Sequence, residues 1–124
     1  MITYDRLFIA GVWSEPSGAG LLEIRSPHDG VVIGRAAQAL PADVDRAVAA
    51  ARAVFEEGVW RGTPPLERVA VLRRFNALRE EGAERIAGLI AAENGSAGWF
   101  TRAGQSGLTR QAEAYLKAAE EFGW

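Results

Sequence analysis

The sequence predicts an α/β fold in which three short strands are followed by about four helices. Residues 7–39 hold short runs of β-branched, aromatic and other apolar residues between clusters of Gly, Pro and Ser, which is typical of strands joined by turns. Residues 41–124 carry apolar residues three and four positions apart, which is typical of amphipathic helices. We therefore expect residues 1–124 to form a single partial domain, with strands and turns in 7–39 and helices in 41–124.

Three segments of the first part are predicted as strands. Residues 7–13 form a short apolar run, and residues 21–25 alternate between apolar and charged side chains. Residues 14–20 between them are rich in turn formers, so the two segments are expected to pair as a β-hairpin. A turn at residues 26–30 leads into a third strand at 31–37. Because three strands make a marginal sheet, helices or further chain should cover it.

Helix start and stop signals divide the second part. The first helix should begin at residues 41–43, where Pro suits a first turn and Asp43 faces the positive end of the helix dipole, and should end at Gly58. Thr63 is the expected N-cap of a second helix, which Gly82 interrupts. A third, shorter helix should end at residues 94–95, an Asn-Gly pair suited to a left-handed cap.

The end of the chain is harder to interpret from its pattern. Residues 96–107 are ambiguous because two aromatic residues stand between glycines, whereas the spacing from Leu108 onward outlines a fourth helix. The four tryptophans are interpreted as apolar anchors of a core. Trp124 suggests that the terminus packs on something or that the natural chain continues. The tryptophans are Trp13, Trp60, Trp99 and Trp124.

Composition indicates an ordinary globular protein and excludes several kinds of site. Apolar residues make up 48% of the chain and charged residues 24%, and the net charge is −2. That balance gives no reason to expect nucleic acid or a membrane as a partner, and no stretch is long and apolar enough for a transmembrane helix. The absence of cysteine excludes disulfides, thiolate metal sites and a cysteine nucleophile within these residues. The expected location is the cytoplasm.

No residue is predicted to be catalytic, cofactor-binding or metal-binding. His28 stands alone in a turn and is interpreted as an exposed turn residue. Residues 18–23 begin like a dinucleotide-binding glycine loop but lack its third glycine and lie between two strands, which favours a hairpin turn. Three pairs of adjacent charged residues are interpreted as solvated helix faces. They are the glutamates at 56–57 and 80–81 and the arginines at 73–74.

Several segments, in order, resemble the aldehyde dehydrogenase family. Residues 7–13 resemble its F-I-x-G-x-W opening, and residues 26–34 resemble N-P-A-T-G-E-V-I-G, with Ser26 in place of the usual Asn. Residues 43–55 are similar to D-V-D-x-A-V-x-A-A-x-x-A-F.

The resemblance continues into the second predicted helix. Trp60-Arg61 and residues 67–74 are similar to the family's W-R…E-R-x-x-x-L-x-x, and residues 93–96 lie where many members carry E-x-G-K. Each motif alone is weak, but five in the right order and spacing are specific. The match covers residues 7–96.

The resemblance implies a fold and an activity for a longer protein. In the family this stretch forms the first part of the NAD(P)-binding domain, packs against a Rossmann-like sheet and belongs to dimeric or tetrameric enzymes that oxidise aldehydes to carboxylic acids. The family's cysteine nucleophile, glutamate base and cofactor glycine region all follow this stretch, so none maps onto this chain. NAD or NADP is implied for the full-length member and no cofactor for this chain.

Three hypotheses remain open, and they leave undecided whether the chain is itself an enzyme. The first is an N-terminal piece of an NAD(P)-dependent aldehyde dehydrogenase that is inert alone and whose partner is the remainder of that enzyme. The second is a structural or partner-binding module that self-associates through exposed apolar helix faces. The third, an independent enzyme, is disfavoured because no acid, base, nucleophile or metal set converges. On either of the first two hypotheses we expect a homo-oligomer or a poorly soluble chain.

Overall fold

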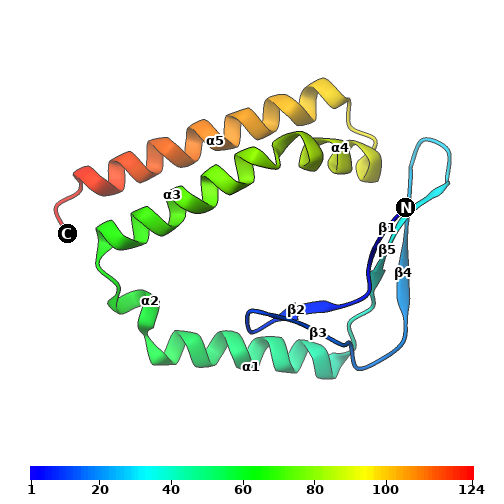
Figure 1. Cartoon of the computed structure of the whole chain (residues 1–124), viewed down its shortest axis with the longest axis horizontal. Coiled ribbons are helices and arrows are strands. Elements are labelled where there is room, and N and C mark those ends of the chain that lie inside the picture. Colours follow the sequence, from blue (N-terminus) through cyan, green and yellow to red (C-terminus); the bar gives the residue numbers. More distant parts are fainter. The chain divides into compact units, whose positions relative to one another are not determined.

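The computed structural model describes residues 1–124 and confirms the predicted class, with short strands followed by helices (Figure 1). The chain divides into two compact units, Met1–Arg61 and Gly62–Trp124. The first unit holds all the strands and the first long helix, and the second is entirely helical. No helix combines the length and the apolarity that crossing a membrane requires.

A three-stranded sheet is the main β element of the first unit. Its order is β1 (Ile2–Tyr4), β5 (Val32–Ala37) and β4 (Leu21–Arg25), with β1 parallel and β4 antiparallel to the central β5. The short β1 was not predicted, because three residues carry no readable alternation. Gly34 lies opposite Ile2, and a Cβ at Gly34 would stand 3.1 Å from the Ile2 carbonyl oxygen. The missing side chain therefore lets β1 approach β5 closely.

The predicted hairpin between residues 7–13 and 21–25 is wrong. The first segment folds back on itself as β2 (Leu7–Ile9) and β3 (Val12–Ser14), a separate antiparallel pair. The two-residue turn is Ala10-Gly11, and both residues have positive φ, 52° and 81°. Two-residue hairpin turns of this hand match the twist of the flanking strands. The later segment is left to pair with β5.

Helix α1 (Pro41–Glu57) follows the prediction and ends at Gly58, which has the left-handed φ of 71°. Helix α2 (Val59–Gly62) is a single turn that the sequence did not predict. The apolar stripe of α1 is present but uncovered, since Val44 is 53% and Val48 62% exposed.

Helices α3 (Pro65–Glu81) and α4 (Ala83–Asn94) both pack mainly against α5 (Gly98–Glu121) (Figure 1). The break at Gly82 and the left-handed cap at Gly95, with φ of 76°, are confirmed. The N-cap of α3 is Pro64 and not Thr63, because the helix starts at Pro65, whose ring suits a first helical position.

The start of α5 corrects the prediction of a fourth helix from Leu108. The helix begins at Gly98 and runs through the ambiguous segment. Three glycines within its first ten residues weaken the helical pattern, since each costs about 1 kcal/mol relative to alanine. Tertiary packing overrides that preference, because Thr101 and Gln105 in this half are buried.

Neither unit encloses a substantial apolar core. The buried residues of the first unit are Gly34 and Asp43, and the buried apolar residues of the second are Val69, Ala87 and Leu116. The interpretation of the tryptophans as core anchors is therefore wrong for these residues. Each is 44% exposed or more: Trp13, Trp60, Trp99 and Trp124.

Trp124 does pack within its own unit. Its indole Nε1 donates to the Ala119 carbonyl oxygen at 2.9 Å, and the Arg68 guanidinium lies 5.6 Å from the centre of its ring. A cation over an indole face is a favourable arrangement. The aromatic side chain thereby joins the end of the chain to both α3 and α5.

Candidate functional site

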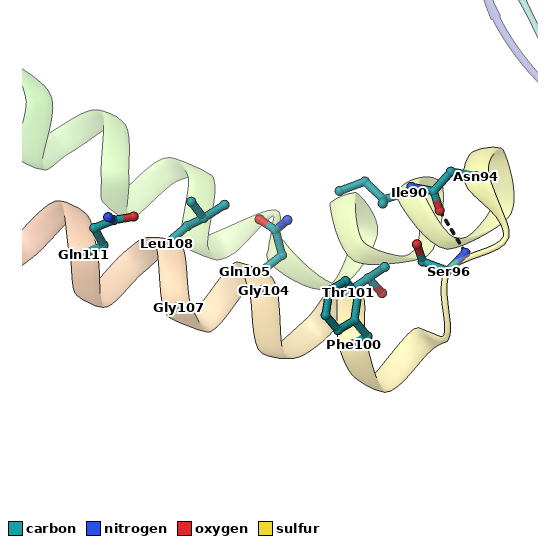
Figure 2. A pocket seen from close by; sticks show the side chains of 10 residues that line it. All are labelled: Ile90, Asn94, Ser96, Phe100, Thr101, Gly104, Gln105, Gly107, Leu108 and Gln111. Carbon is teal, nitrogen blue, oxygen red and sulfur yellow. Dashed lines mark hydrogen bonds between the residues drawn. The ribbon is translucent and has the colours of Figure 1, made fainter.

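A hollow of about 580 Å³ extends along α4 and the first half of α5, and Figure 2 shows the side chains around it. Its lining is apolar, glycine or uncharged polar, and no lining side chain is ionisable. The residues are Ile90, Asn94, Ser96, Phe100, Thr101, Gly104, Gln105, Gly107, Leu108 and Gln111.

Several polar groups of this hollow are already engaged within the chain. Asn94 Oδ1 accepts from the Ser96 backbone N–H at 2.9 Å, the bond drawn in Figure 2. Thr101 Oγ1 donates to a backbone carbonyl in the first turn of α5 at 3.0 Å, and Gln105 Oε1 accepts from Arg79 Nη1 at 2.9 Å. The two hydroxyls have no base beside them, so nothing here can act as an activated nucleophile.

A second hollow, of about 380 Å³, lies along α3 and α5 and shares Leu108 and Gln111 with the first. Arg79 is its one charged lining residue. The Arg79 guanidinium also donates to Asn76 Oδ1 at 3.2 Å and to Thr109 Oγ1 at 2.6 Å. Since these bonds occupy the guanidinium, it serves to join the two helices.

A polar seam joins α3 to α5 and includes these bonds. Arg73, which the sequence analysis interpreted as part of a solvated face, pairs with Glu120 at 2.7 Å. Asn76 Nδ2 donates to Glu113 Oε1 at 3.1 Å. The hydrogen bond from Arg73 lowers the pKa of Glu120 and raises that of Arg73 itself. The seam residues are Arg73, Asn76 and Arg79 on α3 and Gln105, Thr109, Glu113 and Glu120 on α5.

The first unit holds one buried carboxylate, Asp43, at the start of α1. It accepts from the Leu40 backbone N–H at 2.8 Å and from the Ser17 backbone N–H and hydroxyl at 2.9 and 2.7 Å. Arg46 Nη2 donates to the same carboxylate at 2.6 Å. These donors, with the Leu40 N–H contributing most, hold the pKa of Asp43 well below its ordinary value. Every contact is to a group of this chain, so the carboxylate fixes the loop before β4 to α1.

The other residues considered in the sequence do not converge. His28 is exposed in its turn, as expected, and the glutamate pairs at 56–57 and 80–81 are exposed on α1 and α3. No group of three or more His, Asp or Glu side chains could hold a metal ion.

The glycine-containing segment that begins like a dinucleotide-binding loop does not form one. Residues 18–20, the glycine-containing segment, connect β3 to β4, but these strands do not pair, so the predicted hairpin turn is wrong. No helix follows them, so no helix N-terminus is available to hold a pyrophosphate there.

Two features of these sites were not found from the sequence. The contact between Asp43 and Ser17 joins residues 26 positions apart, and no local pattern signals it. The absence of charge from the lining of the first hollow could have been predicted from the spacing of charged residues after position 98. That signal was missed because residues 96–107 were not recognised as helical.

Comparisons with known proteins place this geometry in a family. Residues 13–123 match the aldehyde dehydrogenase family. N-succinylglutamate 5-semialdehyde dehydrogenase 2 of Caulobacter vibrioides is 39% identical over 115 residues, which are 93% of this chain and 23% of that protein. The mitochondrial benzaldehyde dehydrogenase of Antirrhinum majus is 35% identical over 94 residues, 76% of this chain and 18% of that protein.

A solved structure shows the same fold. The structure of Mycobacterium tuberculosis aldehyde dehydrogenase, which is complexed with NAD+, superposes with a TM-score of 0.88 and 37% identity over 99% of this chain and 26% of that chain. The chain thus spans about a quarter of the length of the relatives it matches. Sequence and structure agree, and the chain belongs to the aldehyde dehydrogenase family.

Proposed function

We propose that these residues serve as the N-terminal segment of an NAD(P)-dependent aldehyde dehydrogenase, an enzyme that oxidises an aldehyde to a carboxylic acid. On this proposal the segment alone is catalytically inert. One observation carries the proposal: the chain has the fold of the family, yet the hollow along α4 and α5 has no ionisable side chain in its lining. Without an acid, base or thiolate, that hollow has no group to carry out the chemistry.

The role of the segment is then to fold into part of the dehydrogenase and to present apolar surface to the remainder. Unburied apolar side chains on α1 support this role, because an isolated soluble protein rarely leaves such stripes uncovered. The partner is the rest of a dehydrogenase polypeptide, and the cofactor, NAD or NADP, is bound by residues outside this segment. Full-length assemblies would be homo-oligomers in the cytoplasm.

A second candidate is a stand-alone module that self-associates. The stripe on α1 favours it equally, since Phe55 and Val54 are 64% and 56% exposed and could pack on a second copy. The two candidates differ in one requirement. The segment functions only as part of a dehydrogenase, whereas the module functions without one.

A chimaera separates the two. The matching 115 residues of the Caulobacter vibrioides enzyme, its aligned segment, are replaced by those of this chain. We expect the chimaera to oxidise its aldehyde with NAD or NADP, and the isolated chain to show neither turnover nor cofactor binding. An inactive chimaera together with a well-defined oligomer of the isolated chain would favour the module. Turnover by the isolated chain would overturn the claim of inertness.

A further inference from the structure

The charged residues of α5 are confined to one side of the helix. At 3.6 residues per turn they fall within an arc of about 100°. Two of them belong to the polar seam, and Arg102 and Lys117 pair with Glu84 and Glu121. The charged residues are Arg102, Arg110, Glu113, Lys117, Glu120 and Glu121.

A second side of α5, of similar width, carries no charge over the whole helix. We call it the uncharged face: Phe100, Gly104, Gly107, Leu108, Gln111, Tyr115 and Ala118. A 24-residue helix is about 36 Å long, so this face is long enough to cross a small domain.

The uncharged face is open and apolar. Phe100 is 60%, Leu108 50% and Tyr115 67% exposed. Both hollows described above open along it, one toward α4 and one toward α3, and they share Leu108 and Gln111. Figure 2 shows these two side chains in the lining of the first hollow. An amphipathic surface helix normally turns its apolar side inward, so a long apolar side left outside indicates that another element covers it.

The glycines of this face leave room for close approach. A Cβ built at Gly104 or at Gly107 meets no atom within 4 Å, so neither glycine is required by packing inside this chain. In a helix each glycine costs about 1 kcal/mol relative to alanine. Glycine in such a place is explained when another backbone must approach the helix closely.

We propose that the uncharged face of α5 is the surface on which the remainder of an aldehyde dehydrogenase polypeptide packs, with Gly104 and Gly107 at the closest approach. This inference rests on the proposed function and names the contact surface. The occupant follows from the comparison: the Mycobacterium tuberculosis relative matches 99% of this chain with a TM-score of 0.88, while the match covers only 26% of that relative. The lack of charge on the face fits a buried contact, because burying an unpaired charge is costly.

The test compares one substitution in two settings, the isolated chain and the chimaera. Gly104→Glu places a charge on the uncharged face, and Gly104→Ala fills the same position without a charge. Ser106→Glu is the matched control, since Ser106 is an exposed residue on the charged side of the same helix. Thermal unfolding midpoints and aldehyde turnover with NAD or NADP are measured for all variants.

In the isolated chain we expect Gly104→Glu to unfold at the same or a higher temperature, because it replaces a helical glycine at an open position. In the chimaera the same substitution should lower the unfolding midpoint by about 5 °C or more and should lower turnover at least about tenfold. Both effects are expected because the substitution buries an unpaired charge. Ser106→Glu should change turnover by less than about twofold, as expected for a surface substitution.

Three results would overturn the inference, and each is distinct. If the chimaera is active and tolerates Gly104→Glu as well as Ser106→Glu, the face is not covered, although the proposed function stands. If the isolated chain forms a dimer that Gly104→Glu alone dissociates while the chimaera tolerates it, the occupant is a second copy. If the unsubstituted chimaera is inactive, the proposed function fails and the inference fails with it.

Discussion

Asp43 shows how one residue can organise the strand-containing unit. The sequence analysis placed it correctly at the positive end of α1, and the structure adds that its carboxylate also binds Ser17 in a distant loop. A carboxylate with several donors is stabilised in its charged form. Its role is thus predictable in part, because helix capping is local and the loop contact is not.

We expect Asp43→Asn to lower the thermal midpoint at pH 7, because the amide removes the charge and cannot accept at both ends. The folded pKa of Asp43 lies below its unfolded value, so its contribution is full above about pH 4 and is lost as pH falls through the folded pKa. Circular dichroism melts from pH 7 to pH 2 should therefore show a constant difference between the variant and the wild type down to about pH 4, which narrows as the pH falls further. Asp45→Asn, at an exposed site of the same helix, is the control and should have little effect.

Ala10 occupies a backbone conformation that alanine disfavours. Its φ of 52° is the one positive φ outside glycine, in the turn between β2 and β3. Asn tolerates this region, and Asn-Gly is a preferred pair in two-residue hairpin turns. Ala10→Asn should raise the free energy of unfolding by about 0.5–1 kcal/mol, measured by urea titration. Ala10→Ser should not raise it, because serine lacks that preference. Equal stabilisation by both substitutions would contradict the inference that Ala10 is strained.

At the scale of elements, the helical unit is joined by polar contacts as much as by apolar ones. Its buried residues include Asn76, Thr101 and Gln105 beside three apolar side chains. The seam between α3 and α5 supplies the hydrogen bonds that such buried polar groups need. The two helices are therefore held in register by specific partners.

Arg79 is the residue on which this seam most depends. Arg79→Met should lower the free energy of unfolding by about 1–3 kcal/mol, because buried acceptors on Asn76 and Gln105 lose their donor. Arg74→Met, on the exposed side of α3, removes the same charge without breaking the seam. Similar losses in the two variants, compared by urea titration, would show that the seam contributes little.

The elements also show what the sequence could and could not predict. Helix ends at Gly58, Gly82 and Gly95 were predictable because a glycine stop is a local signal. The pairing of the strands was not predictable, because residues 7–13 have the pattern of one continuous strand and nothing in it marks the turn at Ala10. The early start of α5 was hidden by glycines whose cost is offset by tertiary contacts.

At the scale of the whole molecule, the periodic apolar residues of the helices were identified correctly, but the expectation that they are buried was wrong. Helical spacing predicts that one side will be covered, without showing that the cover lies within the same 124 residues. The prediction that the tryptophans anchor a core was wrong for the same reason. The family itself was predictable, because its short motifs occur here in the expected order, although the chain spans only about a quarter of the length of its relatives.

The uncovered surfaces predict how the isolated chain behaves. We expect concentration-dependent self-association in size-exclusion chromatography with light scattering, and binding of a dye that reports exposed apolar surface. Both follow from the exposed stripe of α1 and the uncharged face of α5. A stable monomer at 13.3 kDa that binds no dye would contradict this expectation.

We propose that this chain is a segment of a cofactor-dependent dehydrogenase and holds no cofactor site of its own. Calorimetric titration of NAD into the isolated chain and into the chimaera, repeated with NADP, tests it most directly. We predict saturable binding of one or both dinucleotides by the chimaera and no binding heat with the isolated chain. A saturable isotherm from the isolated chain would contradict the account, since it would require a dinucleotide site within these 124 residues.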